Sequence, residues 1–174
     1  MPLSLRSARA ADAGGICALH AMSCRSAYAG MLDRDFLEND LEDALAAHWQ
    51  DLLRGRRRPG QVVMAVTGHQ VNGFAAAMLE GTCCQVGSLH VRPEMRGGGI
   101  GRQLLGTLAH RLRQQGALSA ELWVFTANEG AIRFYRRLGG QLGPPVMREA
   151  FGQPVSERRM HWPDLAALVG ACAR

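Results

Sequence analysis

A glycine-rich loop, residues 96–101, is the part of the sequence whose residue types point most directly to chemistry. It follows an alternating apolar segment that ends at Val91, and it precedes a helical pattern. The first N–H groups of a helix have no partner inside that helix, and glycines let the backbone approach a ligand closely. Arg96 adds a forked cation that suits phosphate oxygens. The stretch therefore predicts a loop that binds a phosphate or pyrophosphate.

Two familiar phosphate loops do not fit this stretch. The P-loop requires a lysine after its glycines, and none follows here. The dinucleotide-binding fingerprint requires a glycine at the position that Arg102 occupies. The spacing that fits is Arg-x-x-Gly-x-Gly, formed by Arg96, Gly99 and Gly101. Together with the Leu-x-Val step before it, this spacing resembles the acetyl-CoA signature of the GNAT superfamily of N-acetyltransferases.

A second segment downstream strengthens the resemblance. Residues 122–139 follow the pattern Leu-x-Val-x-x-x-Asn-x-x-Ala-x-x-Phe-Tyr-x-x-x-Gly, which is similar to another GNAT element and includes Asn128 and Tyr135. Residues 24–32 are similar to a segment that walls the acceptor pocket in one bacterial GNAT branch, with Cys24 in place of the usual aromatic residue. Two separate motifs in the expected order argue against coincidence.

The resemblance implies a fold and a cosubstrate. The fold is a mixed α/β GNAT fold, with a mostly antiparallel sheet, a central pair of parallel strands that splay apart, and flanking helices. The cosubstrate is acetyl-CoA, and no metal is implied. The residues expected to bind it are Leu89, His90, Val91, Arg96, Gly97, Gly98, Gly99, Ile100, Gly101, Asn128 and Tyr135.

The implied reaction is the direct transfer of an acetyl group from acetyl-CoA to the primary amine of a small molecule or protein. A strand N–H near Val91 would stabilise the oxyanion. Tyr135 stands at the family's position for the group that protonates the leaving thiolate. A phenol has an ordinary pKa of about 10, so it stays protonated at pH 7 and can donate.

The catalytic base is the uncertain part of the pattern. Many relatives carry a glutamate four residues ahead of the position of Leu89, where this chain has Gln85. Strand alternation predicts that His90 points to the opposite face from Gln85 and Leu89, which disfavours it as the base.

Three carboxylates, Glu80, Glu121 and Glu157, remain as candidates. Glu157 is selected as the second catalytic residue, because the closing strand in this branch often carries a glutamate that reaches the acceptor site. A water relay without a single base is the alternative. The loss of the usual glutamate also leaves open a non-catalytic CoA-binding sensor or interaction module with the same fold.

The periodicity of the chain predicts the elements that must position these residues. Helices are expected over residues 12–24, 35–53, 100–115 and 129–138, and residues 164–173 read as a short apolar helix or a frayed end. Strands are expected over residues 3–9, 61–66, 71–79, 83–91 and 118–125, with a closing hairpin from 145–147 and 155–162. The helix at 100–115 makes a crossover, so strands 83–91 and 118–125 should be parallel.

Length and composition favour an ordinary globular protein. The chain has 174 residues, 47% of them hydrophobic and 20% charged, which fits one acetyltransferase domain over residues 1–174. Neither a signal peptide nor a membrane span is evident, so we expect a soluble cytoplasmic protein without a membrane partner. Dimers are frequent among similar proteins, which leaves a homodimer open.

Charge and cysteine content suggest two other functions, both of them disfavoured. The net charge is +5, and residues 54–58 are strongly basic, but no aromatic residues are interleaved, so no nucleic-acid partner is expected. The five cysteines are expected to be free thiols. Cys17, His20 and Cys24 would share one helical face and could mimic metal ligands, but an apolar packing face is the favoured interpretation.

Overall fold

The computed structural model describes residues 2–54 and 60–174. Seven strands form one sheet in the order β1-β2-β3-β4-β5-β7-β6. They are β1 (Ser4–Ser7), β2 (Gly60–Thr67), β3 (Gln70–Glu80), β4 (Cys83–Val91), β5 (Ser119–Phe125), β6 (Gln141–Ala150) and β7 (Gln153–Trp162). Every neighbouring pair is antiparallel except β4 and β5, which are parallel as predicted. The mixed, mostly antiparallel α/β fold is therefore confirmed.

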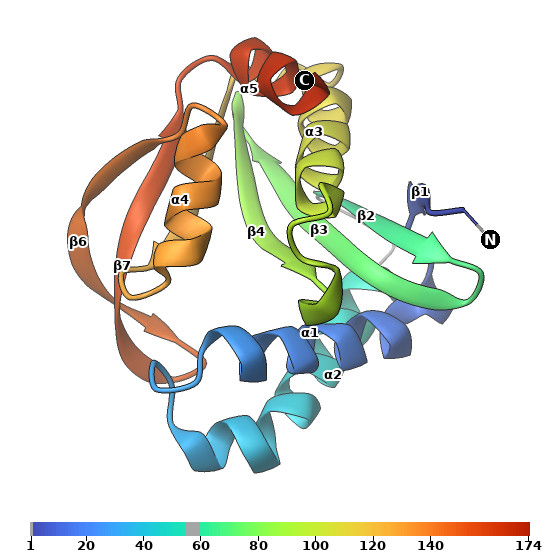
Figure 1. Cartoon of the computed structure of the whole chain (residues 1–174), viewed down its shortest axis with the longest axis vertical. Coiled ribbons are helices and arrows are strands. Elements are labelled where there is room, and N and C mark those ends of the chain that lie inside the picture. The colour runs from blue at the N-terminus through green and yellow to red at the C-terminus, as the bar shows by residue number, and fades with distance from the viewer. Residues whose placement is uncertain (1, 55–59) are drawn as a thin grey trace.

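Helices cover both faces of the sheet (Figure 1). They are α1 (Ala13–Ala27), α2 (Leu41–Arg54), α3 (Ile100–Arg113), α4 (Glu129–Arg137) and α5 (Leu165–Ala173). One core cluster joins α1 and α2 to the sheet around Trp49 and Phe74, and the other joins α3, α4 and α5 to its opposite face around Leu108. None of the described helices is long and apolar enough to cross a membrane.

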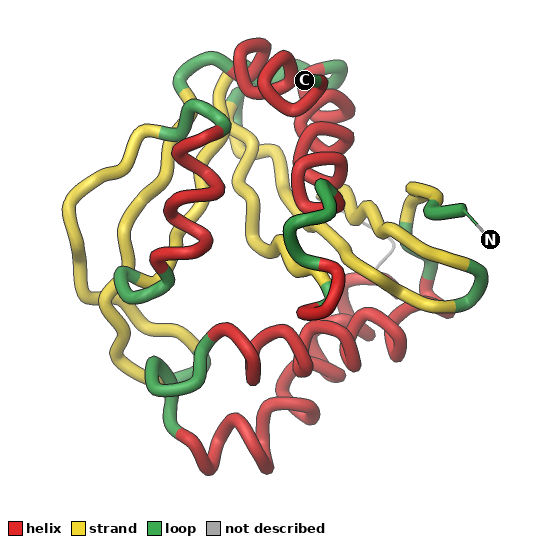
Figure 2. The backbone as a smooth tube through the Cα atoms, viewed as in Figure 1, coloured by secondary structure: helices red, strands yellow, loops and turns green. Residues whose placement is uncertain are grey.

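The sheet forks between its two parallel strands. β4 and β5 pair only at Cys83↔Ser119, Cys84↔Ala120 and Gln85↔Glu121. Beyond Gln85 the two strands run apart, and the divergence can be followed in Figure 2. The backbone edges of β4 and β5 that face each other past this point therefore have no strand partner between them, as the splayed pair predicted from the resemblance requires.

A register shift in β4 overturns the predicted direction of Gln85. Ala76 pairs with Ser88, whereas the next residue of β3 pairs with Val86, so Gly87 is an extra residue in β4. An extra residue reverses the alternation of side chains along a strand. His90 still points away from Leu89, as predicted, but it lies on the same face as Gln85 rather than on the opposite face.

The C-terminal part is more regular than the sequence indicated. The predicted closing hairpin is present, and its strands are longer than expected, because β6 continues past a register irregularity between Leu142 and Pro145. Residues 165–173 form a helix, α5, whose N-terminus is capped by Asp164 through its Oδ1, which accepts from the N–H of Ala166 at 2.8 Å. Of the basic run at 54–58, Arg54 ends α2 and residues 55–58 lie outside the described residues.

Candidate active site

A cavity of about 1370 Å³ follows the fork in the sheet. Its walls come from the separated edges of β4 and β5, the glycine-rich loop, α1, α2, α4 and the β6–β7 hairpin. Every residue selected from the sequence lies along this one cavity: Leu89, His90, Val91, Arg96, Gly97, Gly98, Gly99, Ile100, Gly101, Asn128, Tyr135 and Glu157. The structure therefore brings together residues from five separate segments of the chain.

The glycine-rich loop has the backbone geometry of an anion-binding turn. Gly97 and Gly99 adopt left-handed conformations with φ of 83° and 82°, which side chains other than glycine rarely tolerate. Gly99 is the N-cap of α3, so the unpaired N–H groups of the first helical turn begin directly after it. Apart from Gly97 itself and its two chain neighbours, no described residue has a heavy atom within 4 Å of the place where a Cβ on Gly97 would be. The loop is therefore open to a ligand and suited to phosphate oxygens.

Arg96 connects the loop to α1. Its guanidinium donates to the hydroxyl oxygens of Ser23 and Ser26, each at 3.1 Å. Ser23 Oγ also lies 2.9 Å from Nδ1 of His90. The cation is therefore already engaged with α1, and it reaches the cavity from that side rather than standing free above the glycines.

Asn128 and Tyr135 enter the cavity from α4. Asn128 caps this helix, with Oδ1 accepting from the N–H of Ala131 at 3.2 Å, which leaves its side-chain N–H groups for a ligand. Tyr135 is 8% exposed, and burial raises the pKa of its hydroxyl further above the ordinary value. Within residues 2–54 and 60–174 this hydroxyl has no hydrogen-bond partner. It is a protonated donor held at the cavity wall.

The three candidate carboxylates lie in different places. Glu80 is exposed at the hairpin end of β3. Glu121 accepts from Gln85 Nε2 at 2.9 Å and from Arg159 Nε at 2.6 Å. Burial acts to raise the pKa of Glu121, but these hydrogen bonds and the nearby positive charge of Arg159 together outweigh it and lower the pKa. Of the three, only Glu157 lines the cavity.

Glu157 is a buried carboxylate with one cationic partner. It is 8% exposed, and Nε of Arg148 lies 2.9 Å from its Oε2. Burial raises the pKa of Glu157, and the nearby Arg148 opposes that shift without cancelling it. A carboxylate with a raised pKa is a better proton acceptor than an ordinary glutamate, which suits a catalytic base.

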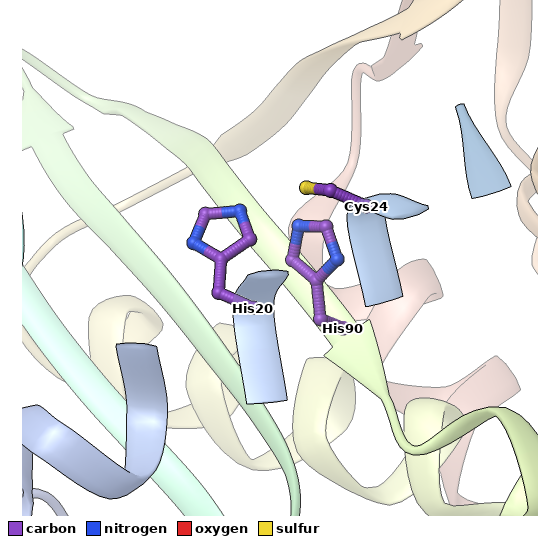
Figure 3. Close-up of side chains that lie close together, drawn as sticks. All are labelled: His20, Cys24 and His90. Atoms are coloured by element: carbon purple, nitrogen blue, oxygen red, sulfur yellow. The ribbon is translucent and has the colours of Figure 1, made fainter. Parts of the chain in front are cut away.

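Two histidines that line the cavity converge on a cysteine of α1. His20, Cys24 and His90 offer ligand atoms within 4.8 Å of one another, and Figure 3 shows one ring nitrogen of each imidazole facing the thiol. Burial lowers the pKa of His20 to about 2 and that of His90 to about 3, so both rings are neutral. Trp49 N–H donates to Nδ1 of His20 at 3.0 Å.

The hydrogen bond from Trp49 bears directly on the metal interpretation. Because Nδ1 of the neutral His20 ring accepts, its other nitrogen carries the proton and has no lone pair for a metal ion. Cys17, the third residue of the set considered from the sequence, instead donates its thiol to the backbone carbonyl of Glu42 at 3.6 Å. The cluster therefore suits a packed polar group better than a metal centre.

Sequence reasoning missed several residues that shape the cavity. Phe125 and Trp123 line it from β5, and Phe151 lines it from the β6–β7 turn. The guanidinium of Arg148 lies over the ring of Trp123, 4.0 Å from its centroid. Strand alternation places residues 121, 123 and 125 on one face, a signal that could have identified the aromatic wall, whereas the contact of Arg148 depends on the hairpin register.

Comparison with known proteins agrees with this geometry. The Acetyltransferase (GNAT) family matches residues 24–140. An uncharacterised N-acetyltransferase of Methanocaldococcus jannaschii is 40% identical over 55 residues, which are 32% of this chain and 24% of that protein. Mycothiol acetyltransferase of Streptomyces coelicolor is 31% identical over 104 residues, 59% of this chain and 31% of that protein. The chain thus spans about a quarter to a third of the length of these curated relatives.

A solved structure shares the architecture over nearly the whole chain. The PaiA N-acetyltransferase of Thermoplasma acidophilum, in complex with coenzyme A, superposes with a TM-score of 0.72 at 17% identity, covering 91% of this chain and 98% of that one. Its identity is low, so the likeness concerns the fold. The family match covers the glycine-rich loop, the forked strands and the helix that carries Tyr135. The chain belongs to the GNAT family of acetyltransferases.

Proposed function

We propose that this protein transfers an acetyl group from acetyl-CoA to a primary amine by direct attack, without an acetylated enzyme intermediate. The observation that carries the proposal is the shared cavity: an open phosphate loop lies at one end of the fork, and Tyr135 and Glu157 line the same space. The PaiA structure contains coenzyme A, which supports the same class of ligand at this loop.

The chain supplies binding groups for the cosubstrate. The N–H groups of the glycine-rich loop and the first turn of α3 bind the pyrophosphate, and Arg96 adds positive charge from the α1 side. The unpaired edge of β4 from Leu89 to Val91 offers peptide groups to the pantetheine arm, and Asn128 offers its amide. A Cβ added to Gly101 would lie 3.5 Å from the ring of Phe134 and 3.6 Å from the side chain of Val91, which is ordinary van der Waals contact. The start of α3 therefore packs against β4 and α4.

The transfer itself needs two proton movements. The nitrogen of the neutral amine attacks the thioester carbon, the C–S bond breaks, and the amine proton leaves to Glu157 directly or through water. Tyr135 donates its hydroxyl proton to the departing thiolate. A strand N–H near Val91 stabilises the oxyanion that forms at the carbonyl oxygen.

Thermal unfolding with and without acetyl-CoA tests the proposal first. Acetyl-CoA at a hundred times its dissociation constant adds about 2.7 kcal/mol of stability. For a domain of this size, we expect a rise of roughly 5 to 10 °C in Tm. ATP and NAD serve as controls, because a loop that binds any phosphate would respond to all three. A folded protein that shows no shift with acetyl-CoA would contradict the proposal.

A further inference from the structure

One part of the cavity has a composition that restricts the acceptor. We name this part the acceptor chamber and define it by Tyr28, Leu45, Phe125, Phe151 and Glu157, which all line the cavity. Four of these five side chains are apolar or aromatic. The rings of Tyr28 and Phe125 lie with centroids 4.5 Å apart and tilted by 37°. The chamber therefore offers aromatic faces from the C-cap of α1, from β5 and from the β6–β7 turn.

Glu157 is the one carboxylate among the described residues that line the cavity. The lining cations, Arg96, Arg102 and Arg137, belong to the phosphate loop, α3 and α4 rather than to the chamber. Two of the histidines that line the cavity, His20 and His90, are neutral because burial holds the pKa of each far below its ordinary value. The chamber thus provides one carboxylate, which can bind one positively charged group of the acceptor. It has no second carboxylate for another.

Arg148, which is not itself among the residues that line the cavity, shows that a cation can be held beside Glu157. Its guanidinium lies over the ring of Trp123 and contacts the carboxylate of Glu157, which are an aromatic face and a single anion. A substrate ammonium needs the same two partners. The side chain of Arg148 is 43% exposed, so an incoming amine can displace it into solvent.

An aromatic residue in the β6–β7 turn has a strained backbone conformation. Phe151 has φ of 53°, the one left-handed conformation of a non-glycine residue among those described. Asparagine and glycine adopt this conformation much more readily than phenylalanine. Strain of this kind concentrates at functional sites, and here the strained residue lines the chamber.

We propose that the preferred acceptor is a primary amine with one positive charge, carried by a flat aromatic group. This inference rests on the proposed acetyl transfer. The aromatic group stacks among Tyr28, Phe125 and Phe151, and the ammonium binds beside Glu157; it loses one proton to water before the neutral amine attacks the thioester. Polyamines and basic peptides need additional carboxylates, which the chamber does not provide.

The test compares acceptors at equal concentration by release of free thiol from acetyl-CoA. The panel is 2-phenylethylamine, n-hexylamine, spermidine and a peptide with a free N-terminal alanine. We expect kcat/KM for 2-phenylethylamine to exceed that for each of the others at least tenfold. The inference is overturned if kcat/KM is higher for spermidine or the peptide. It is also overturned if the protein binds acetyl-CoA but acetylates none of the four amines. Neither outcome contradicts the binding of acetyl-CoA. Failure to bind acetyl-CoA removes the proposed function and the inference with it.

Phe151→Asn separates recognition from folding. Asparagine relieves the strained turn, so Tm should rise or stay unchanged, while KM for 2-phenylethylamine should rise at least fivefold. KM for n-hexylamine should change much less, because it has no ring to stack. If the variant is equally stable and KM for 2-phenylethylamine is unaltered, Phe151 has no part in recognition and the aromatic acceptor is wrong.

A new charge on the cavity wall should redirect specificity. Ala44 lines the cavity from α2, and Ala47 is exposed on the same helix outside the cavity lining. Ala44→Glu should raise the ratio of kcat/KM for spermidine to that for 2-phenylethylamine several-fold, whereas Ala47→Glu should leave it unchanged. Equal effects of the two variants would show that the chamber's single charge does not set the preference.

Discussion

At the scale of single residues, Tyr135 carries the clearest chemical prediction. Its hydroxyl is protonated, buried at the cavity wall and without a partner among residues 2–54 and 60–174. Replacement by phenylalanine removes one oxygen and keeps the packing against Phe134 and Trp162. We expect Tyr135→Phe to lower kcat by about 10² to 10⁴-fold, the range for loss of a general acid.

The control for this variant is the thermal shift with acetyl-CoA, which should match that of the wild type. Turnover measured by thiol release decides the outcome. If kcat is unchanged while binding is intact, the hydroxyl does not protonate the thiolate, and the role of Tyr135 is structural.

If Glu157 is the catalytic base, kcat/KM should depend on pH. Because burial raises its pKa above the ordinary glutamate value of 4.5, a base at this position loses activity as pH falls through that raised pKa. The acid limb of kcat/KM should therefore lie above pH 4.5, and Glu157→Gln should remove it and lower the rate. Glu149→Gln, at an exposed position of β6 in the same hairpin, should leave both unchanged. A limb that persists in Glu157→Gln would assign the proton to another group.

At the scale of elements, the two ends of α3 allow a matched test of the phosphate loop. Gly99 begins this helix with φ of 82°, and Gly116 follows its end with φ of 100°. An added Cβ has ordinary contacts or none at either position, so alanine costs mainly backbone strain. Both variants should lose about 1 to 2 kcal/mol of stability.

Only Gly99→Ala should weaken the binding of acetyl-CoA, because Gly99 lines the cavity and Gly116 does not. Titration of each variant with acetyl-CoA should show an increase in Kd of at least tenfold for Gly99→Ala and none for Gly116→Ala. Equal Kd values would mean that the N-terminus of α3 does not receive the pyrophosphate.

The elements also show what the sequence could and could not predict. Periodicity placed the strands up to β5 and the crossover helix close to their observed bounds, because their burial follows simple 2.0 and 3.6 repeats. It placed Gln85 on the wrong face, because Gly87 is an extra residue whose effect depends on the pairing of β3 with β4. The ion pair of Glu157 with Arg148 depends in the same way on the register of the β6–β7 hairpin.

At the scale of the whole molecule, two apolar cores lie on opposite faces of the sheet, and the cavity passes between them at the fork. The core beneath α1 and α2 is unusual in containing neutral imidazoles. His20 lies between Trp49 and Phe74, with ring centroids 5.8 and 5.3 Å away, and stands next to His90 at 4.2 Å. Neither ring can take a proton in place without leaving a poorly solvated charge.

This burial predicts acid lability of the whole fold. Both histidines have an ordinary pKa of 6.5 when unfolded, and folding lowers it to about 2 for His20 and about 3 for His90. Below pH 6.5 the unfolded chain therefore binds protons that the folded chain does not, so the free energy of unfolding falls as pH falls. The loss approaches about 1.4 kcal/mol per pH unit for each histidine.

Urea unfolding between pH 7.5 and 5 measures how the free energy of unfolding changes with pH. Ordinary carboxylates titrate below this pH range. In the double variant His20→Asn/His90→Asn, an amide oxygen still accepts from Trp49 but does not titrate, so the curve should be markedly flatter. His69→Asn, at an exposed turn position, should keep the wild-type slope. If the double variant folds and loses stability with acid as steeply as the wild type, the buried imidazoles do not govern the acid response, and ionic contacts elsewhere must do so.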